Sequence, residues 1–368
     1  LNYGWEHPLW FADEPGTVDT NGFTRPNWFE PVGKACHMLR DRAGIIDSSN
    51  FAKYSVKGEG ASEWLNAIFA NNMPKAIGRS CLTPLIGVRG GIAGDFTVTK
   101  LDDEDFLIIG SGMAERYHLR FFNAVERPDT VSFVSKTEDM CGFNVAGPQS
   151  RTLLERLTNT SLATENFPFM RSQKITLAGV DLVALRVSFT GDLGWELHCA
   201  TEDQVKLYEA LLDAGKDLGA GPVGSRALMS LRVEKGYGSW SREYSPEYWP
   251  QEVGLAPLIK MGKDFLNKAA YEALMANEPR ETLQIIEVLE VDQADATGGE
   301  PIFLPDGTPV GRVTSGTYGY TVGKSLALGF VKGVEAGAEV DVMILGRPHR
   351  GVVLAEPPFD PAGAKLRA

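Results

Sequence analysis

The sequence predicts an α+β protein in which two tandem units of like fold precede a small, strand-rich C-terminal domain. Two observations support this prediction: a local pattern that recurs after 89 residues, and a change to short strands with glycine turns from about residue 283. The chain of 368 residues is long enough for two or three domains. Its apolar content of 43% is ordinary and is sufficient for buried cores.

Residues 1–50 are expected to form an N-terminal arm together with the first strand and helix of the folded body. The arm contains Trp5, Trp10 and Trp28, and four prolines fall within its first forty residues. Because proline breaks helices, we expect this part to be extended and to lie on the rest of the molecule.

The segments 54–65 and 143–154 share the order of a short alternating strand, a glycine turn and an amphipathic helix. The same offset of 89 residues relates strand positions further along the chain, namely Phe106 to Trp195 and Ile108 to Leu197. In both places the strand leads into a second helix. The order strand, helix, hairpin, strand, helix resembles a ferredoxin-like unit.

We therefore expect one pseudo-repeat over 51–140 and a second over 141–282, which includes connecting helices. The region 283–368 contains several short strands with glycine turns, among them a hairpin around Asp306-Gly307. Such a pattern is typical of a small β-barrel or jelly roll.

The formal net charge of −12 argues against a nucleic-acid partner and against binding to an anionic membrane. No apolar run reaches the roughly 18–20 residues that span a bilayer. The polar and aromatic start of the chain does not resemble a signal peptide. We expect a cytoplasmic protein.

The four cysteines form no CxxC pair, and the five histidines form no HxxxH or HExxH motif. We therefore expect no metal site and no disulfide framework. A GxGxxG fingerprint is also missing, and the nearest candidate, Gly58-Glu59-Gly60, is expected to be a joint between a strand and a helix. We expect this chain to bind neither flavin nor NAD.

The run Arg89–Thr99 places a carboxylate, Asp95, after a glycine-rich turn at the start of a short strand. Alternation puts Phe96 and Val98 on one face, and Asp95, Thr97 and Thr99 on the other. Asp95 is either an ordinary turn residue of a hairpin or a carboxylate aimed into a ligand pocket.

The run Arg186–His198 predicts a second hairpin with a Thr-Gly-Asp turn. Glu196 and His198 share one face of it, as an exposed pair or as part of a site. If this hairpin and that of Asp95 are equivalent in the two repeats, the two carboxylates can converge on one central pocket. Carboxylates accept paired hydrogen bonds from amino-pyrimidine edges, so a polar heterocycle is a suitable ligand.

A third cluster, Gly224–Tyr237, has helical spacing, and Arg232 lies in it among apolar neighbours. An ordinary amphipathic helix explains this pattern equally well.

Together these motifs resemble the aminomethyltransferase, or glycine-cleavage T-protein, family. They are most similar to the folate-binding C-terminal half of dimethylglycine and sarcosine dehydrogenases and oxidases. The motifs are the Gly-Gly-x-x-x-Asp-x-Thr-Val-Thr strand, Ala146–Arg151, Ser188–Glu196 and Ser225–Tyr237, and the opening Gly4-Trp5-Glu6 is similar to that subgroup's junction after its flavin domain.

The resemblance implies two ferredoxin-like pseudo-repeats around a central channel, plus a C-terminal β-barrel. It implies that tetrahydrofolate, with or without a polyglutamate tail, binds in this channel. Asp95 then matches the catalytic aspartate. The implied folate contacts are Thr97 and Gly110 near Asp95, Glu196 on the pterin ring with Leu197 and His198 beside it, and Arg232, Tyr237 and Trp240 along the channel.

The chemistry implied is capture of formaldehyde or an iminium from oxidative N-demethylation, giving 5,10-methylenetetrahydrofolate. A fused upstream domain, or a separate flavin or metal subunit, would generate the one-carbon unit, in the cytoplasm or in a mitochondrial matrix. One alternative is a demethylase that yields 5-methyltetrahydrofolate. Another is a non-catalytic folate-binding or scaffold module.

Overall fold

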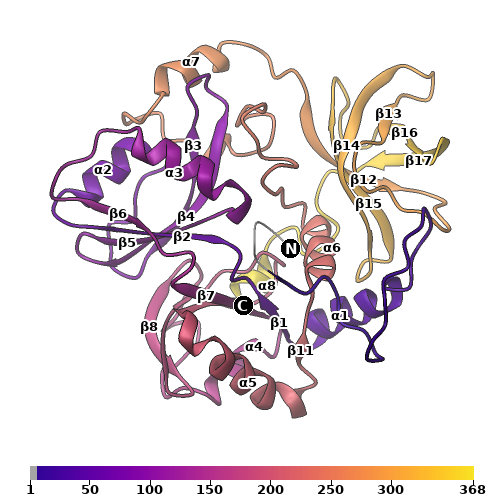
Figure 1. The fold of residues 1–368 in the computed structure, drawn as a ribbon. Helices are drawn as coiled ribbons and strands as arrows, with labels where there is room; N and C mark the ends of the chain where they lie inside the picture. The colour runs from indigo at the N-terminus through magenta and orange to yellow at the C-terminus, as the bar shows by residue number, and fades with distance from the viewer. Residues whose placement is uncertain (1–5) are drawn as a thin grey trace.

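The computed structural model describes residues 6–368, and Figure 1 shows two sheet-and-helix units beside a barrel. Gly4 and Trp5, which contribute to the resemblance and to the expected arm, lie outside the described residues. The chain enters the folded body through helix α1 (Phe29–Asp41) and strand β1 (Gly44–Asp47).

The first repeat forms a five-stranded antiparallel sheet in the order β3-β4-β5-β2-β6. Its helices pack on one face, over a core that includes Tyr54, Trp64 and Phe96. The elements are β2 (Ala52–Lys57), α2 (Ala61–Ile68), β3 (Ser80–Ile86), β4 (Ile92–Asp102), β5 (Asp105–Gly110), the 3-10 turn η1 (Gly112–Ala114), α3 (Glu115–Asn123) and β6 (Ser132–Ser135).

The second repeat has the same succession of elements, so the predicted duplication is confirmed. The elements are β7 (Met140–Ala146), α4 (Ser150–Glu155), β8 (Ser172–Leu177), β9 (Val180–Leu185), β10 (Gly194–Ala200), α5 (Gln204–Gly215) and β11 (Gly221–Pro222). The sheet order is β11-β1-β7-β10-β9-β8. Strand β1 therefore lies next to β7, in the position that β6 has next to β2 in the first sheet. The sequence did not predict this pairing of β1.

The two sheets face each other, because the helices of each repeat lie on its outer side (Figure 1). The backbone also joins the sheets at one edge. The amide of Ser80 donates to Met170 O at 3.0 Å, and the amide of Ser172 donates to Gly78 O at 2.8 Å. The side chains that each sheet directs away from its own helices therefore lie between the two repeats.

The C-terminal strands form a closed six-stranded barrel in the order β12-β15-β14-β13-β16-β17, so a barrel is confirmed and a jelly roll is not. Helices α6 (Ser225–Glu234) and α7 (Lys268–Met275) precede it. The barrel elements are β12 (Thr282–Val288), β13 (Pro301–Phe303), β14 (Pro309–Gly319), β15 (Lys324–Val331), β16 (Glu339–Ile344) and β17 (Arg347–Val353), and α8 (Ala364–Arg367) follows them.

Two sequence-based expectations about the carboxylates are wrong. Residues 186–193 form a loop after β9, so the predicted strand at Arg186–Phe189 does not exist. Asp95 lies on β4, whereas Glu196 lies on β10, whose counterpart in the first repeat is β5. The hairpins that carry the two carboxylates are therefore not equivalent.

Among residues 6–368, no helix is both long and apolar enough to cross a membrane.

Arg40 joins four parts of the chain through a fully buried ionic network. Its guanidinium pairs with Asp192 of the 186–193 loop and, at 3.0 Å, with Glu234 of α6. It also lies 3.3 Å from the centre of the Phe359 ring. Burial raises the pKa of Asp192, and the charge of Arg40 opposes this effect.

We expect Arg40→Ala to destabilise the protein by about 3–5 kcal/mol, because Asp192 and Glu234 would stay buried without a cation. Urea unfolding at pH 7 measures this loss. Arg156→Ala, which breaks an exposed pair with Asp217, is the control and should shift the unfolding midpoint far less. Equal effects of the two substitutions would contradict a structural role for the network.

Candidate active site

Asp95 lies near the start of β4, opposite Pro84 of β3. Phe96 and Val98 enter the core under α2 and α3, so the predicted alternation is confirmed. Asp95 and Thr97 therefore share the helix-free face of the first sheet, where both are half-buried.

Among residues 6–368, no charged side chain contributes to the pKa shift of the Asp95 carboxyl group. Its Oδ1 atom is buried and has no hydrogen-bond partner among the described residues. Burial raises the pKa of Asp95 to about 6, and a hydrogen bond from its own backbone opposes this only in part. A carboxyl group that titrates near neutral pH is typical of a functional site.

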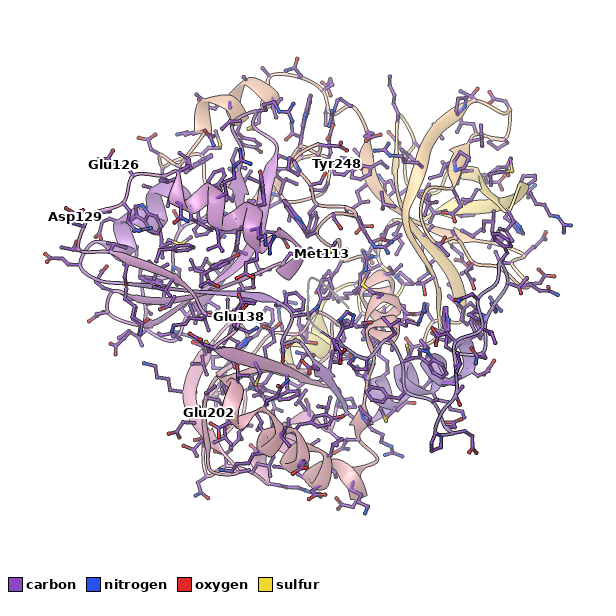
Figure 2. All side chains as sticks on the ribbon, viewed as in Figure 1. Met113, Glu126, Asp129, Glu138, Glu202 and Tyr248 are labelled. Carbon is purple, nitrogen blue, oxygen red and sulfur yellow. The ribbon has the colours of Figure 1, made fainter. Side chains whose placement is uncertain are left out.

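The segment 236–248 covers the start of β4. The amide of Ile92 donates to Tyr248 O at 3.1 Å. Burial, and next the charge of Asp95, raise the pKa of Tyr244. In Figure 2, Met113 of η1 lies between the first repeat and this segment, and its sulfur is 3.7 Å from the Ser241 hydroxyl.

Trp240, one of the predicted folate contacts, packs edge-on against His118 of α3 at 5.5 Å and stacks with Tyr117 at 6.2 Å. His118 is fully buried, its Nε2 has no hydrogen-bond partner in the described chain, and burial lowers its pKa to about 3. The imidazole is therefore neutral. Sequence reasoning missed His118, because nothing in the local pattern distinguishes it from a core residue.

Gly110 is a packing position beside this histidine. A Cβ atom there would lie 2.7 Å from the Phe96 ring and 3.6 Å from His118 Nδ1. The side-chain direction at Gly110 therefore points into the core of the first repeat. Asp95 and Thr97 point away from this core, to the opposite face of the sheet.

Glu196 and His198 lie on the helix-free face of the second sheet. Glu196 Oε2 is 3.5 Å from His198 Nε2, and the Glu196 side chain is 22% exposed. Three neighbours on this face contribute buried polar atoms without hydrogen-bond partners within residues 6–368: His198, Asn144 and Ser48. Gly142 makes room here, since a Cβ would lie 3.2 Å from His198 Nδ1.

Lys53 of β2, in the first sheet, interacts electrostatically with Glu196 of the second sheet. Its ammonium group donates to Ser49 O and Phe51 O, both at 2.8 Å. Burial lowers the pKa of Lys53 to about 8, and the charges that oppose this include that of Glu196. A residue of the first sheet thus lies within the electrostatic reach of Glu196.

The structure separates other predicted contacts from the two faces. Leu197 is fully buried in the core under α4 and α5, opposite to Glu196, so its side chain cannot contact a ligand there. Arg232 is fully buried and is bound to Glu243 at 2.9 Å, Tyr237 O at 2.8 Å and Ser315 at 2.6 Å, which makes it structural. Tyr237 is half-buried and stacks on Phe189 at 6.0 Å.

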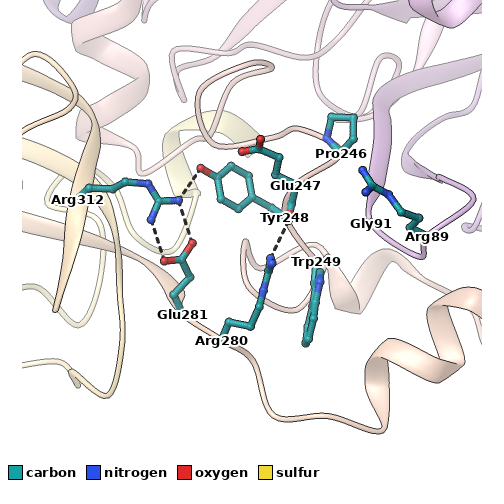
Figure 3. A pocket seen from close by; sticks show the side chains of 9 residues that line it. All are labelled: Arg89, Gly91, Pro246, Glu247, Tyr248, Trp249, Arg280, Glu281 and Arg312. Atoms are coloured by element: carbon teal, nitrogen blue, oxygen red, sulfur yellow. Dashed lines mark hydrogen bonds and ion pairs between the residues drawn. The ribbon is translucent and has the colours of Figure 1, made fainter.

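A cavity of about 450 Å³ opens where the first repeat, the 246–249 segment and the barrel meet (Figure 3). Arg312 pairs there with Glu281 at 2.9 Å, and Arg280 pairs with the buried Glu252 at 2.8 Å. Neither Asp95 nor Glu196 lines this cavity. Within the described part of the chain, no cluster of three or more histidine, cysteine or acidic side chains could hold a metal ion.

Comparison with known proteins assigns the family. A model of the GCVT N-terminal domain matches residues 2–263, and one of the glycine cleavage T-protein C-terminal barrel domain matches residues 285–360. The chain belongs to the glycine-cleavage T-protein family. This is a family of folate-dependent aminomethyltransferases, so the resemblance drawn from the sequence is confirmed.

Proteins that are similar in sequence to this chain include two longer ones. Mitochondrial dimethylglycine dehydrogenase of Mus musculus is 34% identical over 99% of this chain and 43% of its own length. The 4-methylaminobutanoate oxidase (formaldehyde-forming) of Paenarthrobacter nicotinovorans is 30% identical over 99% of this chain and 44% of its own length. The chain therefore spans less than half the length of these relatives.

The fold also matches a solved T-protein. The glycine cleavage system aminomethyltransferase T from Bartonella henselae superposes with a TM-score of 0.82 at 21% identity. The match covers 94% of this chain and 95% of that one.

Ionisation of Asp95 should make stability depend on pH. Because its folded pKa of about 6 exceeds the ordinary 3.8, the folded state binds the proton more tightly, and stability falls as pH rises from 4 to above 6. We expect the stability of Asp95→Asn, relative to the parent, to increase over this range by on the order of 2 kcal/mol.

Urea unfolding between pH 4 and 7.5 measures this difference, with the exposed Asp213→Asn of α5 as the matched control. A constant difference between Asp95→Asn and the parent at all pH values would show that the carboxyl group is not perturbed.

Proposed function

We propose that this chain is the tetrahydrofolate-dependent one-carbon-transfer unit of a demethylating dehydrogenase or oxidase. It would capture formaldehyde from an N-methylated amine, such as dimethylglycine or sarcosine, and release 5,10-methylenetetrahydrofolate. One observation carries the proposal: a T-protein fold presents Asp95 and Glu196 on two facing sheet surfaces, beside buried polar atoms that have no hydrogen-bond partner among the described residues.

The donors and acceptors on these faces fit a folate. The amino-pyrimidine edge of a pterin donates hydrogen bonds that the Glu196 carboxylate can accept in pairs. His198, Asn144 and Ser48 add unpartnered polar atoms on the same face. Since leaving such atoms unpaired is costly, a polar heterocycle bound here would stabilise this face.

Asp95 is suited to the proton transfers of the reaction. Tetrahydrofolate, when bound, supplies the nitrogens to which a carbon at the oxidation level of formaldehyde attaches. With a pKa of about 6, the Asp95 carboxyl is mostly ionised at neutral pH and can still accept and return a proton. As a carboxylate it would stabilise positive charge that develops beside it in a partly dry site.

In this proposal, residues 6–368 do not generate the one-carbon unit, and another domain or subunit supplies it. Both longer relatives carry names of oxidative enzymes, and one of these names includes formaldehyde formation. We therefore propose a fused domain or separate subunit that oxidises the N-methyl group, in the cytoplasm or in a mitochondrial matrix.

The first experiment combines calorimetry with a rate assay. We expect the chain to bind tetrahydrofolate and to accelerate its reaction with formaldehyde over the uncatalysed rate. Asp95→Asn should retain binding but lose about 10²-fold or more of the acceleration, because it cannot take up a proton. Mass analysis identifies the product.

The exposed Asp213→Asn is again the control and should behave as the parent does. If the folded chain does not bind tetrahydrofolate, the proposal fails. Acceleration that survives Asp95→Asn would favour a folate-binding scaffold. A parallel incubation with tetrahydrofolate and dimethylglycine, without formaldehyde, tests the direct demethylase, for which 5-methyltetrahydrofolate would be the product.

Glu196→Gln should weaken tetrahydrofolate binding about 10- to 100-fold, because a charged acceptor of paired hydrogen bonds is lost. Glu202→Gln, on an exposed turn of the same repeat (Figure 2), is the matched control. Calorimetry measures both affinities, and an unchanged affinity for Glu196→Gln would remove Glu196 from the site.

A further inference from the structure

Two of the four cysteines lie side by side in the second repeat, and the proposed reaction uses neither. Cys141 of β7 and Cys199 of β10 are paired directly across antiparallel strands. Their sulfur atoms are 3.2 Å apart, and both side chains are buried. The two cysteines are 58 positions apart in the chain, which explains why sequence spacing did not reveal the pair.

We propose that Cys141 and Cys199 form a reversible oxidation site, which hydrogen peroxide closes to a disulfide and a dithiol reductant reopens. Directly opposed residues of antiparallel strands have Cα atoms about 4.5–5.5 Å apart. Disulfides tolerate Cα separations of about 4.4–6.8 Å. The bond can therefore form without a rearrangement of the sheet.

The local chemistry favours Cys141 as the first sulfur to react. The hydrogen bond between the two sulfur atoms lowers the pKa of Cys141. The ammonium group of Lys53 acts in the same direction. A thiolate is the reactive form of cysteine.

The reaction proceeds in two balanced steps. The Cys141 thiolate attacks one peroxide oxygen, the O–O bond breaks, and the released hydroxide takes a proton to leave as water. The Cys199 sulfur then attacks the resulting sulfenic sulfur, the S–O bond breaks, and a second water leaves with the thiol proton. The two sulfurs lose two electrons, which the peroxide gains.

The pair lies one residue inside the ends of its two strands, and the exposed Ala200 follows Cys199. Beside it, the amide of Thr201 donates to Asp139 O at 3.1 Å, and the Thr201 hydroxyl donates to Glu138 O at 2.9 Å. Glu138 and Glu202, labelled in Figure 2, are exposed around this junction. In this proposal, peroxide reaches the two buried sulfurs from this exposed junction.

The other two cysteines lie in different cores. Cys36 packs between α1 and α6, and Cys81 packs beside the core of the first repeat. Burial raises the pKa of both of these thiols, including that of the partly buried Cys81, so they ionise less readily than Cys141 and oxidation should be selective. The new bond would also close a long loop of the unfolded chain, which stabilises the folded second repeat.

The test treats the purified chain with hydrogen peroxide, blocks the remaining thiols by alkylation, and maps the peptides by mass spectrometry. We expect a Cys141–Cys199 linked peptide that lacks two hydrogen atoms, two alkylated thiols at Cys36 and Cys81, and recovery of all four thiols after reduction. The oxidised chain should melt a few degrees higher than the reduced chain.

Cys199→Ser should abolish the linked peptide, whereas Cys81→Ser is the matched control and should retain it. Irreversible oxidation without a cross-link, or a bond to Cys36, Cys81 or a second molecule, would overturn the proposal. Because the peptide map of the parent chain needs neither a variant nor folate, its result is independent of the proposed function.

Discussion

The buried ion pair between Arg232 and Glu243 holds together the parts of the molecule that enclose Asp95. Arg232 belongs to α6, and its guanidinium also binds Tyr237 O and Ser315 of β14. Glu243 accepts further hydrogen bonds from the Ser239 amide at 2.9 Å and the Thr314 hydroxyl at 2.7 Å. Helix α6, the barrel and the segment 236–248 therefore meet at one buried charge pair.

Loss of either partner would leave the other charge buried alone, which is strongly destabilising. This constraint fixes Trp240 and Tyr244 above β4, and thereby the dry surroundings that raise the pKa of Asp95.

Strand alternation then assigns the chemistry to one side of each sheet. Every second residue of β4 and β10 enters a core, so the remaining positions must face the space between the repeats. Asp95 and Glu196 occupy such positions although they stand on non-equivalent strands. A facing arrangement of the strands that carry the two carboxylates thus does not require a strict two-fold relation between these strands. It requires only that two sheets, each covered by helices on the outside, face each other (Figure 1).

The sequence was informative wherever the signal was local or periodic. The 89-residue offset predicted the duplication, and alternation predicted the faces of Asp95, Thr97, Glu196 and His198.

The sequence was uninformative where contacts between distant parts of the chain determine the structure. Strand β1 joins the second sheet beside β7, which no local pattern indicates. Leu197 and Arg232 belong to the motifs that resemble the family. In the structure, however, Leu197 is buried in the core of the second repeat, and Arg232 forms a buried ion pair with Glu243. His118 was missed because its position against Trp240 depends on a segment more than a hundred residues away.

The proposed function requires a folate bound between the two helix-free faces, and a structure of the chain determined with tetrahydrofolate tests this requirement most directly. We predict a ligand that contacts Glu196 through its pterin ring and brings its reactive nitrogens beside Asp95. A ligand seated instead in the cavity lined by Arg89, Arg280 and Arg312 (Figure 3), or on any surface that excludes Asp95, would contradict it.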